Sequence, residues 1–237
     1  MKYSTNMKTL RGILNSPFII MGLMLIISAG CKKSSSTIPA SGQTMTDTDG
    51  NVYPVVTIGT QTWMAANLKT THYRNGHAIT PVSDSLQWST LATEGFCDPL
   101  NNAAMVSVYG LFYNWYAVTD ANNIAPAGWH VPTDAEWATL TSYLGTGGGG
   151  KLKTTGFTYW SSPNAGATNS TGFSALPAGD RSYTGLFHYM GTYGCWWCSN
   201  ESDATNAWEH VVSCNSANIT RVAYPKGIGL SIRCIKD

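Results

Sequence analysis

One segment of the chain has a clear helical period of apolar and polar positions, residues 134–144. Thr133 precedes it and Glu136 stands three residues later, a capping box in which each side chain accepts from a backbone N–H near the other. Gly145 follows as a stop. The apolar side chains recur at the spacing of one helix face: Trp137, Leu140 and Leu144. The pattern therefore predicts a helix over residues 134–144.

Runs of β-branched and aromatic residues between turn signals predict strands in most of the remaining chain. Residues 52–58 follow an Asp-Gly turn, and residues 62–68 predict a second strand. The aromatic segment 109–118 has the spacing of a short helix. The glycine run 147–150 predicts a mobile connector. Short strands are expected after it, at residues 155–160, 172–176, 194–198, 207–214, 219–224 and 229–235.

The N-terminus has the pattern of a bacterial lipoprotein signal. Basic residues precede an apolar run at residues 18–27, which is too short to span a membrane but suits a signal peptide. The sequence Ser-Ala-Gly-Cys then ends at Cys31 and resembles a lipobox. We therefore expect residues 1–31 to be a signal peptide ending at the lipobox cysteine, with Cys31 carrying the lipid in the mature protein.

Three regions follow from this reading: the signal peptide, a flexible polar tether over residues 32–44, and one domain over residues 45–237. The expected location is the cell envelope, as an outer-membrane lipoprotein that contacts the membrane through its lipid. No acidic run follows Cys31, so the sequence leaves open whether the domain faces the periplasm or the cell surface.

Charge and composition narrow the function classes. Only 11% of the residues are charged, against a usual share of about 25%. Three of the 14 basic residues and none of the 13 acidic ones lie in residues 1–31, so the mature chain has a net charge of −2. Nucleic-acid binding needs a basic surface, and we exclude it as a function.

Six cysteines raise the question of pairing. If Cys31 is lipidated, five remain, and Cys214 and Cys234 in two predicted strands are the disulfide candidate. Cys195 and Cys198 form a C-W-W-C motif, which is compatible with a redox pair, half of a metal site or a local bridge. A zinc site would need two further ligands, and no His or Cys pair has matching spacing. We therefore assign no metal and no cofactor.

Sequence motifs for catalysis are also missing. The five histidines form no HExxH motif, and neither a nucleophile elbow nor a phosphate-binding loop is present. The Asp-Thr-Asp-Gly-Asn sequence from Asp47 is interpreted as a turn; its spacing is also that of part of a calcium loop, but the distal glutamate is missing. Four acids fall in the loop-rich second half and are assigned to the solvated surface: Asp180, Glu201, Asp203 and Glu209. No residue is assigned a catalytic role.

Six sequence blocks in a fixed order resemble the Fibrobacter succinogenes major paralogous domain. They include GNVYPVVTIGTQTWMAANL, APAGWHVPTDAEWATLTSYLG and GIGLSIRCIKD, and together they span residues 45–237. That family is common in lipoproteins of Bacteroidetes. The VPTDAEW block also resembles the formylglycine-generating, sulfatase-modifying enzymes. The resemblance implies an α+β, C-type-lectin-like fold in which two helices pack on twisted antiparallel sheets with long loops.

The leading functional expectation is a non-catalytic binding or adhesion module for a glycan or an envelope protein. A lectin-like scaffold carries varied loops, and four aromatic residues are candidates for ligand binding: Trp196, Trp197, Trp208 and Tyr183. One alternative is a thiol- or copper-dependent oxidase that uses Cys195 and Cys198, as the formylglycine-generating enzymes use a cysteine pair. The other is a structural, fimbria-like component of the envelope.

Overall fold

The computed structural model describes residues 42–237 of the chain. The predicted signal peptide and Cys31 lie outside the described residues, as does most of the predicted tether. Thr44 already belongs to the first strand, so the folded domain begins one residue before the predicted boundary. Within the described residues, no helix is long and apolar enough to cross a membrane.

The fold is a mixture of α-helices and antiparallel sheets. Only one helix is longer than seven residues, and five α-helices are present in the described residues where two were expected. These are α1 (Ser85–Ser89), α2 (Ala103–Tyr109), α3 (Trp115–Val118), α4 (Asp134–Leu144) and α5 (Gly148–Leu152). A single 3₁₀ turn, Pro99–Asn101, precedes α2.

The largest sheet joins the two ends of the described chain. Its strand order is β1-β2-β3-β12-β6, so the last strand lies between an N-terminal strand and a central one. All of its pairs are antiparallel. Its members are β1 (Thr44–Thr46), β2 (Val52–Ile58), β3 (Gln61–Met64), β6 (Trp129–His130) and β12 (Ile235–Lys236).

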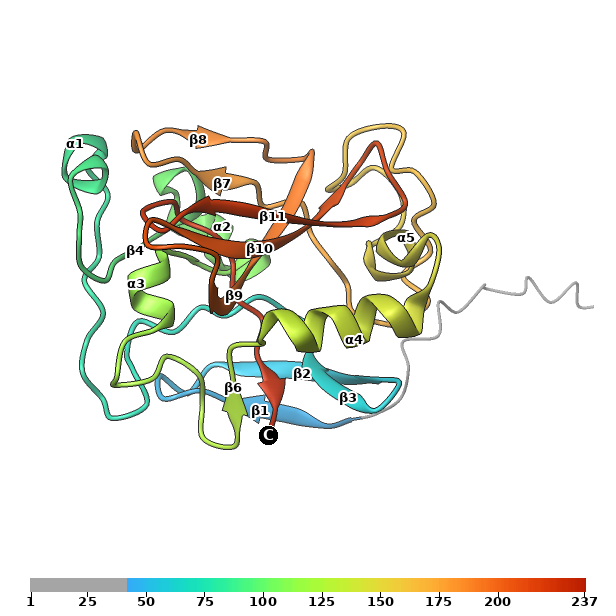
Figure 1. Cartoon of the computed structure of the whole chain (residues 1–237), viewed down its shortest axis with the longest axis horizontal. Coiled ribbons are helices and arrows are strands. Elements are labelled where there is room, and N and C mark those ends of the chain that lie inside the picture. Colours follow the sequence, from blue (N-terminus) through green and yellow to red (C-terminus); the bar gives the residue numbers. More distant parts are fainter. Residues whose placement is uncertain (1–41) are drawn as a thin grey trace, which may run out of the picture. The chain divides into compact units, whose positions relative to one another are not determined.

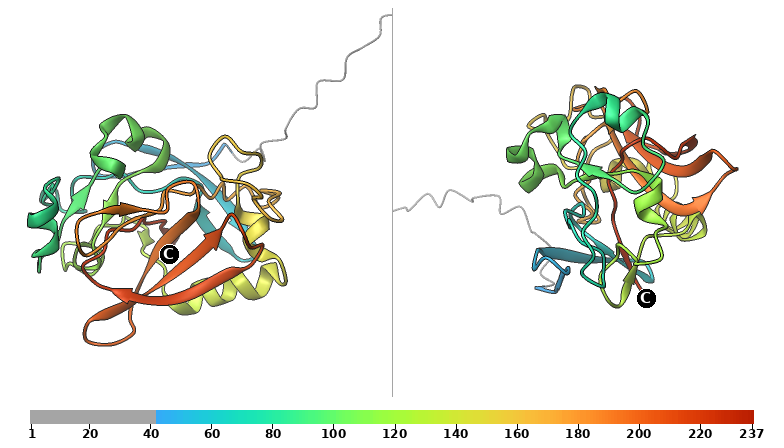
Figure 2. Two further views of the ribbon diagram at one scale, coloured as in Figure 1. Left: turned by 90° about the horizontal axis from the view of Figure 1, so that it is seen from above. Right: turned by 90° about the vertical axis from the view of Figure 1, so that its left-hand side faces the viewer.

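A second sheet of three long strands has the order β11-β10-β9 and is also antiparallel. Its strands twist strongly, as the two views of Figure 2 show. They are β9 (Tyr193–Glu201), β10 (Asn206–Ser213) and β11 (Ile219–Pro225). Two short hairpin-like pairs complete the set: β4 (Phe96–Cys97) with β5 (Phe112–Tyr113), and β7 (Asp180–Arg181) with β8 (Phe187–His188).

Helix α4 confirms the prediction over residues 134–144, including its cap. The Thr133 hydroxyl accepts from the Glu136 backbone N–H, and the Glu136 carboxylate accepts from the Thr133 N–H at 2.7 Å. Figure 1 shows α4 between the five-stranded sheet and β9–β11. Its buried face enters a core of aromatic rings. In that core the Trp137 centroid lies 4.9 Å from Trp63 and 6.1 Å from Trp196.

Two expected elements take a different form. The aromatic run 109–118 is the end of α2, strand β5 and one turn of α3, because Gly110 at φ 73° ends the first helix. The glycine run is not a mobile connector. It begins α5, and a Cβ on Gly150 would lie 2.1 Å from the Gly166 carbonyl oxygen. At Gly149 and Gly150 another backbone segment approaches too closely for any side chain.

Three of the six short strands predicted after residue 150 are confirmed. Residues 52–58 form β2 as expected, and the pieces at 194–198, 207–214 and 219–224 fall within β9, β10 and β11. The piece predicted at residues 155–160 forms no strand, and that at 172–176 makes only an isolated bridge at Ala175. The piece predicted at residues 229–235 makes isolated bridges at residues 229–231 and joins β12 only at Ile235.

Candidate functional site

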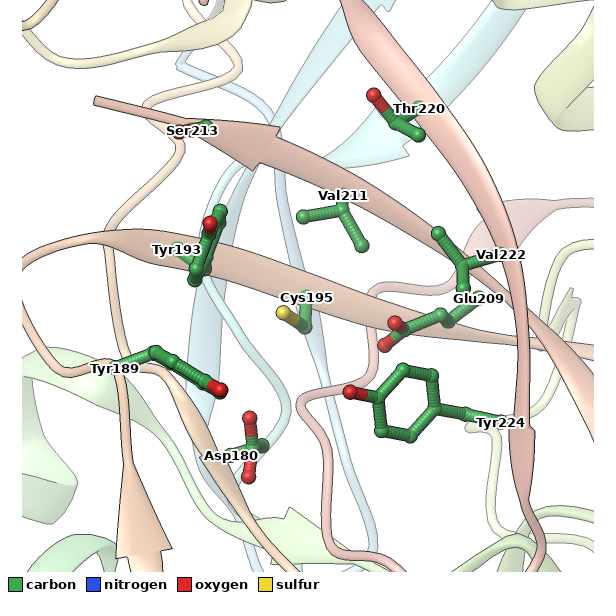
Figure 3. Close-up of a pocket in the computed structure, with 10 residues that line it drawn as sticks. All are labelled: Asp180, Tyr189, Tyr193, Cys195, Glu209, Val211, Ser213, Thr220, Val222 and Tyr224. Carbon is green, nitrogen blue, oxygen red and sulfur yellow. The ribbon is translucent and has the colours of Figure 1, made fainter. Parts of the chain in front are cut away.

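A pocket of about 420 Å³ opens on one face of the β9–β11 sheet. Figure 3 shows the side chains that surround it, and we call it the carboxyl pocket because two buried acids lie in it. Strand β7 and the segment after β8 close its other side. Its lining residues are Asp180, Tyr189, Tyr193, Cys195, Glu209, Val211, Ser213, Thr220, Val222 and Tyr224.

Strand register explains why these residues meet. Side chains alternate between the two faces of a strand, and directly paired residues of neighbouring strands share a face. Glu209 pairs with Val222 on one side and Trp197 on the other, while Val211 pairs with Cys195. The face that holds the pocket therefore takes every second residue of the three strands.

Burial changes the acid–base behaviour of both carboxyl groups. Glu209 is 4% exposed, and its Oε2 makes no hydrogen bond with any described residue. Burial, together with the nearby charge of Asp180, raises the pKa of Glu209 to about 8. Burial also raises the pKa of Asp180 to about 6, against the opposing effect of His188, whose Nδ1 lies 3.8 Å away. At neutral pH the pocket therefore holds one ionised and one protonated carboxyl group.

Three tyrosines form the wall and rim of the pocket. Figure 3 shows the hydroxyls of Tyr189 and Tyr224 pointing into the same space as the two carboxyl groups. Tyr189 is 52% exposed and packs edge-on against Tyr193, with centroids 5.1 Å apart. Its backbone has φ 62°, a left-handed conformation that is uncommon for an aromatic residue and costs free energy. Such strain is often found at functional sites, and here it holds the ring at the pocket's rim.

This arrangement suits recognition of a small polar ligand. The lining contains carboxyl groups, tyrosine hydroxyls, two smaller hydroxyls and apolar side chains, but no Lys or Arg. An ionised carboxylate only accepts hydrogen bonds, whereas a protonated carboxyl group also donates one. The pocket can therefore both accept and donate hydrogen bonds beside aromatic surfaces.

The four predicted aromatic binding residues do not form the site. Trp196 and Trp197 are 1% and 0% exposed, and their indole N–H groups donate to Asn67 and to the Tyr113 carbonyl. The prediction that they bind a ligand at the surface is therefore corrected: both are core residues. Trp208 is half-buried beneath the Arg221 guanidinium, and Tyr183 is exposed but does not line the pocket.

The predicted cysteine pairings are also corrected. All five described cysteines are unpaired and buried. Cys214 and Cys234 belong to different core clusters, so the expected disulfide between them is absent. Cys195 and Cys198 are three residues apart along β9, which places them on opposite faces about 10 Å apart. A disulfide needs Cα atoms within about 7 Å, so the C-W-W-C motif is not an intramolecular redox pair.

The acidic residues divide between surface and interior. Glu201 and Asp203 are exposed, as expected. Asp47 accepts from the backbone N–H groups of Asp49 and Asn51, which agrees with the interpretation of that segment as a turn. Asp180 and Glu209 were assigned to the surface and are instead buried in the pocket.

A signal for Glu209 was present in the sequence. Alternation along the predicted strand 207–214 places Glu209 on the same face as the apolar Val211, which indicates a covered face. That face becomes a pocket floor only because β7 packs near it, and no local pattern in the sequence predicts this contact.

Comparison with known proteins identifies the family. The family model described as the Fibrobacter succinogenes major domain matches residues 56–236. The chain therefore belongs to this family, as its sequence blocks predicted. No curated protein matches the chain.

Proposed function

We propose that this member of the Fibrobacter succinogenes major domain family is a lipid-anchored, non-catalytic binding protein of the outer membrane that recognises a glycan in the carboxyl pocket. The observation that carries the proposal is the convergence of two buried carboxyl groups and two tyrosine hydroxyls in one open pocket. The N-terminal lipobox pattern supports the envelope location.

A sugar fits the chemistry of this pocket. Each sugar hydroxyl both donates and accepts a hydrogen bond, which matches ionised Asp180 beside protonated Glu209. Tyrosine rings offer apolar faces to the C–H groups of a sugar ring. The pocket's 420 Å³ lies within the range of about 300–1,000 Å³ that is usual for small-molecule sites.

The scaffold is consistent with the lectin-like fold that we propose for the domain. One long helix, α4, packs on antiparallel sheets, and long connections such as residues 153–179 lack regular strands. A lectin-like scaffold would carry its recognition residues on the second half of the chain, where Asp180, Tyr189 and Glu209 lie.

Glycoside hydrolysis is the second candidate function, because one observation favours it. An acid with a raised pKa beside an ionised carboxylate is the pair of groups that this reaction uses. A bound glycan that is recovered uncut supports pure binding, and a shortened glycan supports hydrolysis.

A glycan array tests the proposal. We expect the wild-type protein to retain a defined set of glycans, and Asp180→Asn and Tyr189→Ala to lose them. Tyr183→Ala is the matched control, because this tyrosine is similarly exposed but lies outside the pocket. Equal retention by wild type and Asp180→Asn, or signal no higher than that of a tag-only control, would contradict glycan recognition at this site.

The remaining alternative is a structural role in the envelope. Crosslinking in cells separates it from glycan binding. A structural component would be captured in stable complexes with envelope proteins, and substitutions in the carboxyl pocket would leave those complexes intact.

A further inference from the structure

The opposite face of the β9–β11 sheet carries a second group of polar side chains, away from the carboxyl pocket. Asp134 is the first residue of α4, Cys198 lies in β9 and His210 in β10. One ligand atom from each lies within 4.8 Å of the other two. A pocket of about 380 Å³ beside them is lined by Asp134, His210 and the exposed side of α4.

His210 has unused hydrogen-bonding capacity in this group. Its side chain is 5% exposed, and its Nδ1 has no partner among the described residues. Its Nε2 lies 3.3 Å from the Asp134 Oδ1. In one tautomer two lone pairs face each other across this gap, and in the other Nδ1 is a buried acceptor without a donor. A cation bound by Nε2 and the carboxylate removes the repulsion between the two lone pairs in the first tautomer, in which Nδ1 keeps the proton.

The surroundings hold the three side chains in place. The His210 ring stacks on Trp137 with centroids 4.8 Å apart and planes 9° from parallel. The Arg221 Nε donates to the Asp134 Oδ1 at 2.6 Å and fixes that carboxylate. Metal ligands are commonly oriented in this way by contacts from neighbouring side chains. With Cys198 as a thiolate, the charges of Cys198, Asp134 and Arg221 sum to −1, which favours a divalent cation.

We propose that Asp134, Cys198 and His210 bind one zinc ion, with water from the adjoining pocket as the fourth ligand. Thiolate, imidazole and carboxylate are the ligands that zinc takes in proteins, usually in tetrahedral geometry. On binding, the Cys198 thiol releases its proton to solvent and its sulfur forms the bond to zinc, with no change of oxidation state. Only one cysteine of the C-W-W-C motif takes part, and the other ligands come from α4 and β10, so sequence spacing alone did not indicate the site.

Cobalt(II) substitution tests the site, because a cysteine thiolate bound to cobalt gives an intense charge-transfer absorption band. The full chain is used with Cys31→Ser, which removes the one thiol outside the described residues. We expect one equivalent of cobalt to give this band, and zinc to displace the cobalt. The band should be lost in Cys198→Ser and kept in Cys195→Ser, a substitution on the same strand but on the opposite face.

A second variant keeps the proposal falsifiable if Cys198→Ser disturbs folding. Asp134→Asn changes a partly exposed side chain and should weaken zinc affinity at least about tenfold while circular dichroism stays native. Zinc should also raise the melting temperature of the parent protein, because it binds the folded state. Absence of a charge-transfer band in the parent, or an identical band in folded Cys198→Ser, would overturn the proposal.

Discussion

At the residue scale, the central finding is that Glu209 and Asp180 are buried in one pocket. Moving a carboxylate from water into the interior disfavours its charged form, and the charge of Asp180 also disfavours ionisation of Glu209. The protein therefore carries two acids that are costly to ionise. Apolar side chains at these two positions would give a more stable protein. We therefore connect the two acids with ligand binding rather than with stability.

The Glu209→Gln substitution tests this burial through protein stability. Because folding raises its pKa from 4.5 to about 8, Glu209 lowers the free energy of unfolding as the pH rises through that interval. The loss is at most about 5 kcal/mol. Glu209→Gln should therefore be more stable than wild type above pH 8. In this variant the free energy of unfolding should still fall with rising pH below pH 6, because of Asp180. Urea unfolding across pH 4–9 measures it; parallel profiles for the two proteins would mean that Glu209 is solvated.

Residue roles were predictable where they depend on neighbours in sequence. Thr133 and Glu136 are three residues apart, and their capping box follows from helix geometry alone. The burial of both Trp196 and Trp197 was not predictable. Strand alternation places the two residues on opposite faces of β9, and the sequence does not show that both faces are covered. The covering elements, α4 on one side and the Tyr113 region on the other, come from distant sequence.

At the scale of elements, the Thr133 cap supports α4. Thr133→Ala removes the acceptor for the Glu136 N–H and should cost about 1 kcal/mol of unfolding free energy. Thr139→Ala, at an exposed position on the same helix, is the control and should change stability by less than about 0.5 kcal/mol. Chemical denaturation of both variants checks the difference, and equal effects would show that the box contributes nothing beyond helix propensity.

The glycines of α5 provide a second test at this scale. A Cβ at position 150 would lie 2.1 Å from the Gly166 carbonyl oxygen, so Gly150→Ala should destabilise the domain by about 2 kcal/mol or more. Gly227 has no atom within 4 Å of such a Cβ, and Gly227→Ala should be close to neutral. Thermal unfolding compares the two, and a neutral Gly150→Ala would favour the mobile connector that the sequence predicted.

The geometry of strand β9 determines the reactivity of Cys195 and Cys198. Because Cys195 and Cys198 are buried on opposite faces, a thiol reagent should modify neither in the native protein and both after unfolding. Counting labelled thiols by mass spectrometry in a Cys31→Ser background, before and after mild oxidation, measures this. A mass loss of two hydrogens that maps to Cys195 and Cys198 in the native protein would contradict the strand geometry.

At the scale of the whole molecule, the sequence predicted the composition of the fold better than its topology. A mixture of helix and strand follows from local period, and so do the positions of β2, β3, β9, β10 and β11, whereas the antiparallel arrangement was implied by the family resemblance. The insertion of β12 between β3 and β6 does not, because β12 is only two residues long and its partners are distant in sequence. The approach of Asp180 in β7 to the β9–β11 face, which creates the carboxyl pocket, is likewise a contact between segments that are distant in sequence.

The most direct test of the account is the pH dependence of glycan affinity, measured by calorimetry with a glycan that the array identifies. If ionised Asp180 accepts and protonated Glu209 donates, affinity should be highest between about pH 6 and 8 and fall on both sides. Glu209→Gln, which keeps a hydrogen-bond donor at every pH, should remove the fall on the alkaline side. An affinity that is flat with pH would contradict the account, and so would one that rises steadily above pH 8, which would indicate a cationic ligand such as a lysine side chain of a protein partner.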